Sequence, residues 1–263
     1  MNLSNHNELA KRLLEAEKNL QPIRPLTEDN PNIDIDDGYH IQILQIEEKV
    51  KAGARIVGKK IGLTSKAMQN MFCVNQPDFG HLLNTMMHVD GEEIPVRQFI
   101  QPKLESEIGF VLKQDLKGPG VSALDVLQAT DYIVPAFEII DSRIEDWKIK
   151  FEDTVADNGS SARAVLGGNP VSIENIDLAH IGMVVYKNGQ QVATAAGAAV
   201  LGNPLRAVAW LANALGSYGI PLKSGEIILS GAFTAAVPVE AGDTFTAEFD
   251  RIGSVTVSFK EGE

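Results

Sequence analysis

Cysteine is almost absent from this chain: Cys73 is the only one among 263 residues, so no internal disulfide can form. No apolar run approaches the roughly 20 residues that a membrane-spanning helix needs. Residues 1–20 have the pattern of an amphipathic helix with mixed charges, which is not that of a secretory signal peptide. These absences predict a cytoplasmic protein that does not interact with membranes.

Positive charge is also scarce. The formal net charge is -12, and no run of basic residues is longer than the pair Lys59–Lys60. Such a chain repels phosphate backbones, so nucleic-acid binding is disfavoured. An anionic substrate would therefore need local positive charge from a metal ion or from particular lysines and arginines. Hydrophobic residues make up 44% of the chain, which is ordinary for a folded globular protein with a sizeable core.

Several familiar motifs are missing as well. The sequence has no zinc-type spacing of histidine or cysteine, no phosphate-binding glycine loop and no nucleophile elbow. The five histidines show no metal-ligand spacing and are expected to be structural or exposed.

Two helices are predicted at the start of the chain. Apolar residues recur at spacings of three and four around Leu9–Leu20 and again around Tyr39–Val50. Residues 21–31 between them contain three prolines and are expected to form a turn-rich connector. We therefore expect an N-terminal helical region over residues 1–57.

Short apolar runs bounded by turn residues predict strands in the rest of the chain, for example at Ile108–Leu112 and Ile133–Ile140. Lys187–Gln190 has the Asn-Gly pair of a type I′ hairpin, and a second hairpin is predicted at the C-terminus around Gly253. One helix is expected to interrupt the strands, with Asn203 as its N-cap. This order predicts an α+β fold rich in β-structure.

Three glutamates are candidates for a metal site. Glu105 and Glu107 are two residues apart in a predicted strand, so their side chains project from the same face. Glu138 lies inside an apolar strand, where a charge is costly unless it is paired or bound to metal. Hard divalent cations prefer such oxygen ligands. The alternatives are a solvated strand face for the first two glutamates and an ion pair with Arg143 for the third.

Two further polar clusters could take part in chemistry. Asp153–Ser161 is interpreted as a polar loop that either positions a substrate or forms an ordinary turn. Lys60, in Gly58–Ser65, could pair with a substrate carboxylate, and Asp78, in Gln76–Gly80, could accept a proton from water. Solvated surface positions remain the alternative for both.

These segments together resemble the 2-hydroxypentadienoate hydratase and 4-oxalocrotonate decarboxylase family, within the fumarylacetoacetate hydrolase superfamily. The resemblance covers nearly the whole chain and implies a mixed, β-rich catalytic domain over residues 58–263. It also implies that Glu105, Glu107 and Glu138 hold Mg²⁺ or Mn²⁺. The other positions that match the family's active site are Lys60, Asp78 and Ser160. Homo-oligomers, and association with the partner hydratase or decarboxylase or with the aldolase of the same pathway, are further implications.

The two activities of this family share the metal site, so the surrounding residues must distinguish them. Pro77–Gly80, with its aspartate, is similar to the hydratases, as is Trp147–Ile149. Ser160–Arg163 and Thr234–Pro238 are similar to decarboxylase segments, and Arg143 or Arg163 could bind the second carboxylate that a decarboxylase substrate carries. We expect hydration of 2-hydroxypenta-2,4-dienoate in the meta-cleavage catabolism of aromatic compounds, with 4-oxalocrotonate decarboxylation as the alternative.

Overall fold

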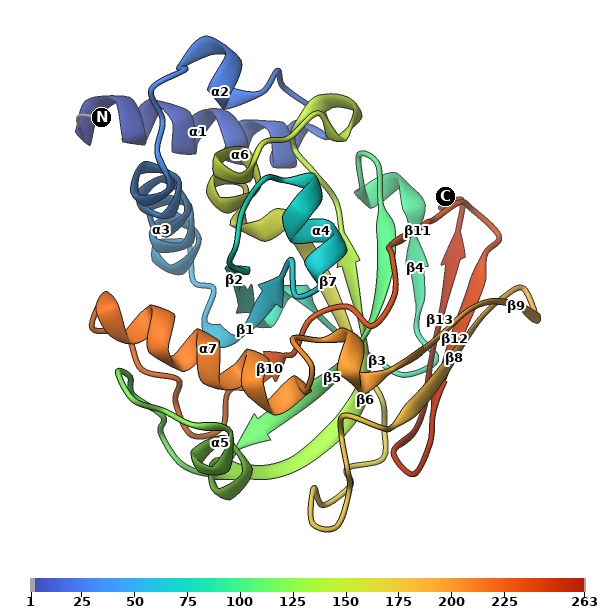
Figure 1. The fold of residues 1–263 in the computed structure, drawn as a ribbon. Coiled ribbons are helices and arrows are strands. Elements are labelled where there is room, and N and C mark those ends of the chain that lie inside the picture. Colours follow the sequence, from blue (N-terminus) through green and yellow to red (C-terminus); the bar gives the residue numbers. More distant parts are fainter. Residues whose placement is uncertain (1–2, 263) are drawn as a thin grey trace.

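The N-terminal helices pack together on one side of the molecule in the computed structural model, which describes residues 3–262 (Figure 1). They are α1 (Leu3–Asn19), the short α2 (Leu26–Asp29) and α3 (Ile35–Lys51). Asp34 caps α3, because its side chain accepts a hydrogen bond from the N–H of Asp37. Both predicted helices are confirmed, and the connector adds one helical turn. A division of the chain at residue 57 stays a prediction.

The main sheet has eight strands and is mixed. Its strands pair in the order β2-β1-β10-β5-β6-β7-β3, and β11 also pairs with β5. β2 also lies against β7, although the two are far apart in that order, so the sheet curls towards a barrel. The bounds are β1 (Ile56–Gly62), β2 (Asp78–Leu83), β3 (Met87–Val89), β5 (Lys103–Leu112), β6 (Thr130–Ile140), β7 (Ser161–Leu166), β10 (Ile227–Leu229) and β11 (Val237–Pro238).

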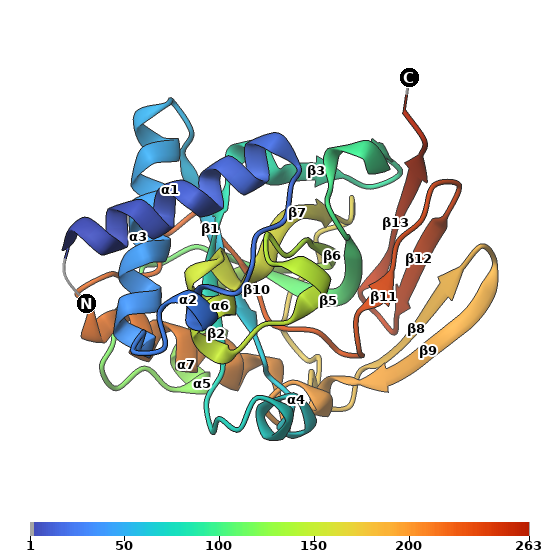
Figure 2. The ribbon, with the colours of Figure 1, turned by 90° about the horizontal axis from the view of Figure 1, so that it is seen from above.

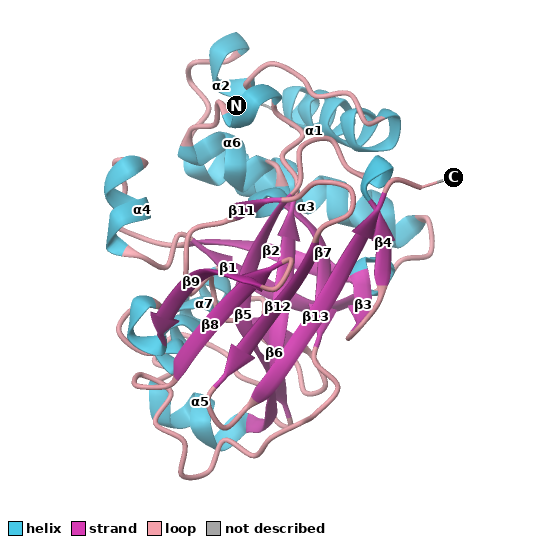
Figure 3. Ribbon diagram, turned by 90° about the vertical axis from the view of Figure 1, so that its right-hand side faces the viewer, coloured by secondary structure: helices cyan, strands magenta, loops and turns pink. Residues whose placement is uncertain are grey.

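A second, five-stranded sheet forms a separate layer in the order β4-β13-β12-β8-β9 (Figures 2 and 3). Both predicted hairpins lie in it, and Asn188 and Gly189 have the positive φ angles that a type I′ turn requires. The bounds are β4 (Glu93–Pro95), β8 (Gly182–Lys187), β9 (Gln190–Ala196), β12 (Thr244–Phe249) and β13 (Gly253–Lys260).

Four more α-helices lie among the strands, so the prediction of one interrupting helix is wrong. That predicted helix is α7 (Pro204–Ser217), and the Asn203 side chain caps it by accepting from the N–H of Leu205. The others are α4 (Lys66–Met71), α5 (Ala123–Ala129) and α6 (Phe151–Ala156). Single 3₁₀ turns lie at Asn84–Met86, Val96–Gln98, Glu145–Trp147, Asn158–Ser160 and Gly197–Ala199.

The two faces of the main sheet are buried in different surroundings. One face packs against the second sheet and α7 in the largest apolar cluster, which includes Phe110, Phe137, Phe245 and Phe259. The inner face of the curl holds a smaller cluster that includes Leu82, Ala136, Ala164 and Leu229. The α+β prediction is confirmed. Among the described residues, no helix has the length and apolar character needed to cross a membrane.

Candidate active site

The strand register places five of the predicted site residues on the inner face of the curled sheet. Residues directly opposite each other in neighbouring strands point to the same side, and so do residues two apart in one strand. Lys60 lies opposite Gly80 in β2 and opposite Leu229 in β10, and Leu229 lies opposite Gly109 in β5. Asp78 is two residues from Gly80, and Glu107 is two residues from Gly109. Strand pairing and the alternation of side chains therefore bring residues of β1, β2, β5 and β10 to one face of the sheet.

Glu105, Glu107 and Glu138 form a compact carboxylate cluster on that face. Glu105 in β5 is directly opposite Glu138 in β6. One oxygen from each of the three side chains lies within 4.8 Å of the others. Glu107 and Glu138 are completely buried, and Glu105 is partly exposed. The solvated-face alternative is therefore wrong, and so is an ion pair between Glu138 and Arg143, because Arg143 pairs with Asp157.

The cluster leaves several carboxylate oxygens without a hydrogen-bond donor. One oxygen of Glu107 accepts the N–H of Gly231 at 2.7 Å. Its other oxygen and both oxygens of Glu138 have no hydrogen-bond partner within the described part of the chain. The nearest positive charge is the Nζ of Lys60, 3.5 Å from an oxygen of Glu138. Buried anionic oxygens without donors are costly, and oxygen-only ligands suit a hard divalent cation, so these residues fit a metal ion.

The pKa values of the three glutamates reflect this shortage of positive charge. Burial, and next the repulsion from Glu138, raise the pKa of Glu105 to about 7. Burial raises the pKa of Glu107 well above its ordinary value, with further repulsion from Glu138 and Glu105. Burial also raises the pKa of Glu138, although Lys60 opposes the change. A cation in the cluster would stabilise the ionised carboxylates, and protons compete for the same oxygens.

Lys60 and Asp78 are buried beside the carboxylates. Burial alone would lower the pKa of Lys60, but the surrounding carboxylates, with Glu138 first, raise it, so the ammonium stays charged. Burial raises the pKa of Asp78, with Lys60 acting against it, and one Asp78 oxygen has no hydrogen-bond partner among residues 3–262. A carboxylate with a free oxygen and a raised pKa is suited to proton transfer.

Two glycines make room for these side chains. A Cβ atom on Gly62 would lie 2.1 Å from Oδ1 of Asp78 and 3.2 Å from Nζ of Lys60. A Cβ atom on Gly159, whose φ is +59°, would lie 2.7 Å from Cε of Lys60. The glycines of the segments around Lys60 and Ser160 therefore line the lysine side chain, which spacing alone did not reveal.

The segment Asp153–Ser161 is not the loop that its composition suggested. Its first residues belong to α6, where the buried carboxylate of Asp153 accepts hydrogen bonds from the N–H and hydroxyl of Thr27 in α2. Ser160 is buried, and its hydroxyl donates to Asp157 at 3.2 Å. The structure thus places Ser160 against Asp157, one residue from the glycine that packs on Lys60.

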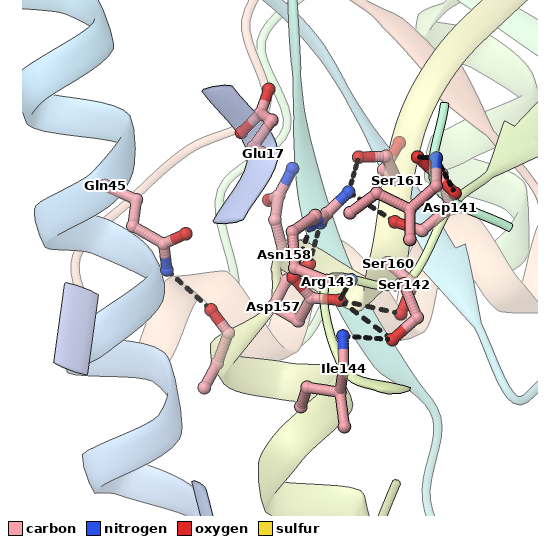
Figure 4. A network of polar contacts seen from close by, with 12 residues as sticks. Glu17, Gln45, Asp141, Ser142, Arg143, Ile144, Asp157, Asn158, Ser160 and Ser161 are labelled. Carbon is pink, nitrogen blue, oxygen red and sulfur yellow. Dashed lines mark hydrogen bonds and ion pairs between the residues drawn. The ribbon is translucent and has the colours of Figure 1, made fainter. Parts of the chain in front are cut away.

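Arg143 and Asp157 form the centre of a buried polar network behind that segment (Figure 4). Nε of Arg143 lies 2.5 Å from Asp157 Oδ1, and Nη1 donates to the carbonyl oxygens of Asp141 and Ser161. Arg163 lies opposite Ile139 in β6, so it points away from the face that carries Glu138. It lines a separate cleft of about 440 Å³ beside α1 and α3. The register and contacts therefore disfavour both arginines as partners for a substrate carboxylate.

Sequence reasoning missed the residues that support the site from outside. Gly231 donates to Glu107, and the side chains of Gln42 and Asn158 bind the backbone of β2. Gln42 could have been noticed, because it stands at a buried position of the apolar face of α3. An uncharged amide at such a position must find partners in the interior.

The sequence and structure comparisons agree with this architecture. The model of the fumarylacetoacetate hydrolase C-terminal family matches residues 60–260, and the chain belongs to that family. It is 46% identical to the 2-hydroxyhexa-2,4-dienoate hydratase of Comamonas testosteroni, over 95% of this chain and 96% of that protein. It is also 46% identical to the 2-keto-4-pentenoate hydratase of Paraburkholderia xenovorans, over 97% of this chain and 95% of that protein.

A solved structure extends the likeness to the decarboxylases. The 4-oxalocrotonate decarboxylase of Pseudomonas putida, solved with magnesium and adipate, is 40% identical to this chain. It superposes with a TM-score of 0.96 over 98% of both chains. The predicted family and its fold are therefore confirmed, and a related structure holds a divalent cation.

Proposed function

We propose that this protein is a metal-dependent hydro-lyase that converts 2-hydroxypenta-2,4-dienoate, the enol form of 2-oxopent-4-enoate, into 4-hydroxy-2-oxopentanoate in the meta-cleavage catabolism of aromatic compounds. The observation that carries this proposal is similarity to hydratases of short dienoates over nearly the full length of both chains. The co-location of Lys60, Asp78 and the three glutamates on one sheet face supports it, because the chemistry needs both charge stabilisation and proton transfer.

Glu105, Glu107 and Glu138 are the proposed ligands of Mg²⁺ or Mn²⁺. Their buried oxygens without donors and the magnesium in the related decarboxylase structure support this assignment. When bound, the cation would act as a Lewis acid towards the carboxylate and the 2-oxygen of the substrate.

Lys60 and Asp78 have distinct proposed roles. The Lys60 ammonium lies beside Glu138 and would stabilise the anionic end of the substrate. Loss of the 2-hydroxyl proton and protonation at carbon 5 give the conjugated 2-oxo-3-enoate. Water then adds across its C3–C4 double bond, so that carbon 4 gains the hydroxyl group and carbon 3 gains a proton. Asp78 would take the proton of that water, because its free oxygen and raised pKa suit it to accept a proton. Ser160 would act indirectly, by holding the segment that contains Gly159 against Lys60.

Decarboxylation of 4-oxalocrotonate is the second candidate function, favoured by the similarity to the solved decarboxylase. That substrate carries a second carboxylate and needs a cationic partner for it. Arg143 is paired with Asp157 and Arg163 points to the other side of the sheet. This arrangement favours the hydratase. Homo-oligomers, association with a pathway partner and a cytoplasmic location stay predictions.

The experiment is a direct comparison of two substrates. Purified protein with Mg²⁺ is incubated separately with 2-hydroxypenta-2,4-dienoate and with 4-oxalocrotonate (2-oxohex-3-enedioate). The products are followed by NMR. We expect 4-hydroxy-2-oxopentanoate from the first substrate and no carbon dioxide from the second. Carbon dioxide release from the second substrate would assign the decarboxylase instead, and no reaction with either would reject both.

A further inference from the structure

Strand β2 ends the main sheet, and it carries Asp78. Among the described residues no strand pairs with its outer edge, although β7 lies nearby, so the outward N–H and C=O groups of Phe79 and His81 need other partners. Two amide side chains supply them. Asn158 accepts the N–H of His81 at 2.7 Å and donates to its C=O at 3.0 Å, as a paired strand would.

Gln42 of α3 supplies the second contact. This residue is completely buried, and its Nε2 donates to the C=O of Phe79 at 3.0 Å and to the C=O of Val155 in α6 at 2.7 Å. Its Oε1 lies 3.0 Å from Nδ1 of His81. One side chain therefore joins β2, next to Asp78, to the helix that leads into Asn158.

These contacts hold two segments on either side of Lys60. Asp78 lies beside Lys60 at the start of β2, and Gly159 packs on the lysine stem after α6. The C=O of Val155 and the C=O of Phe79 are fixed to the same Gln42 amide, so their separation is set by one planar group. A change in that separation would move Asp78 relative to Lys60.

We propose that Gln42, together with Asn158, is a positioning residue that fixes Asp78 for proton transfer, so that α3 takes part in building the active site. This inference rests on the proposed hydratase function and on Asp78 as the group that handles the proton of water. Neither amide belongs to the carboxylate cluster, which β5 and β6 hold through their own register.

Gln45 provides a matched control one turn along α3. It is also buried, and its Nε2 donates to the C=O of Ala156 in α6 at 2.7 Å, the dashed line from Gln45 in Figure 4. The same Nε2 donates to the C=O of Ile41 within the helix. Gln45 thus attaches α3 to α6, as Gln42 does, but within the described part of the chain its hydrogen bonds do not reach β2. Loss of either amide weakens helix packing, and only loss of Gln42 releases β2.

The test compares Gln42→Met with Gln45→Met, since methionine keeps the side-chain length and removes the hydrogen bonds. For Gln42→Met we expect kcat for dienoate hydration to fall by about tenfold to a hundredfold, because small displacements of a catalytic group are costly. KM and Mg²⁺ affinity, the latter measured by calorimetry, should stay within about twofold, because the carboxylates keep their positions. Amide hydrogen exchange in residues 78–83 should become faster. Gln45→Met should keep the kcat and the β2 exchange of the unaltered protein.

Equal loss of kcat in both variants, or parallel loss of kcat and Mg²⁺ affinity in Gln42→Met, would overturn the proposal. If Gln42→Met does not fold, the Asn158→Asp variant tests the positioning role instead. Aspartate keeps the acceptor for the N–H of His81 and loses the donor to its C=O, so kcat should again fall while Mg²⁺ affinity stays; an unchanged kcat would reject the role. If the unaltered protein does not hydrate the dienoate, the proposed hydratase function is rejected. Comparing amide hydrogen exchange in residues 78–83 between the two variants still tests whether Gln42 holds β2.

Discussion

Removing one carboxylate should stabilise the metal-free protein. We consider Glu107→Gln, because a glutamine oxygen can still accept the N–H of Gly231 while the negative charge is lost. Raising the pKa of Glu105 from 4.5 to about 7 corresponds to about 3 kcal/mol of unfavourable free energy for ionising that group in the fold. Burial and repulsion from Glu138 and Glu105 also raise the pKa of Glu107, so Glu107→Gln should raise the free energy of unfolding at about pH 8 in the presence of a chelator.

The pH dependence has a defined sign. The pKa of Glu105 in the fold lies above its value in the unfolded chain, so the folded protein binds more protons between about pH 4.5 and pH 7. Its metal-free stability should therefore fall as the pH rises through this window. Above the window, the free-energy cost of ionising Glu105 in the fold is fully present. Mg²⁺ stabilises the ionised carboxylates, so its effect should be larger at about pH 8 than at about pH 5.5.

Denaturant and thermal unfolding, with chelator or with Mg²⁺, measure the effect of the Glu107→Gln substitution and the effect of pH on stability. Mg²⁺ at about 100 times its Kd should add about 2.7 kcal/mol to the unaltered protein, or about 5–10 °C in Tm for a chain of this size. Glu107→Gln should lose most of this gain. Glu248→Gln, which removes an exposed carboxylate in β12, should change neither quantity. Full Mg²⁺ stabilisation of Glu107→Gln, or equal Mg²⁺ stabilisation at both pH values, would refute the reasoning.

Three further substitutions test separate parts of the site. Asp78→Asn should reduce the hydration rate by at least about a hundredfold and spare Mg²⁺ affinity, and unchanged turnover would reject Asp78 as the group that handles the proton. Gly62→Ala should also reduce kcat, because the added Cβ falls 2.1 Å from the Asp78 carboxylate; crystallography of the variant should show Asp78 displaced. Arg143→Met should lower the free energy of unfolding by about 3–5 kcal/mol, because it leaves Asp157 buried without its cation, and a loss below 1 kcal/mol in denaturant unfolding would contradict that.

Local patterns predicted the elements with long or distinctive signals. The helical periodicity of α1 and α3, the Asn-Gly turn and the capped start of α7 are visible in a short window of sequence. The short helices α4, α5 and α6 were missed, because six or seven residues cannot display a clear helical period. In α6 the pattern is further hidden by polar residues such as Asp153, which is buried because α2 supplies its partners.

The candidate site was predictable only in part, because some of its geometry depends on local spacing and the rest depends on strand pairing. The two-residue spacing of Glu105 and Glu107 places them on one face of any strand, whereas their alignment with Glu138 depends on how β5 pairs with β6. The proximity of Lys60 to Asp78 depends on the pairing of β1 with β2. Such pairings join residues that are distant in sequence, so their register could not be derived from the chain alone.

The consecutive lysines at positions 59 and 60 have a consequence for folding fidelity. They point to opposite faces of β1, yet both are almost completely buried. Lys60 lies beside Glu138, while Lys59 is held at 2.6 Å by both oxygens of Glu226. A shift of β1 by one residue would put one lysine in the position of the other and bring Gly58 or Ile61 into the vacated position, so one buried ammonium group and one buried anionic partner would be left unmatched. An error in the pairing register would therefore be penalised electrostatically at the strand that carries Lys60, the proposed active-site lysine.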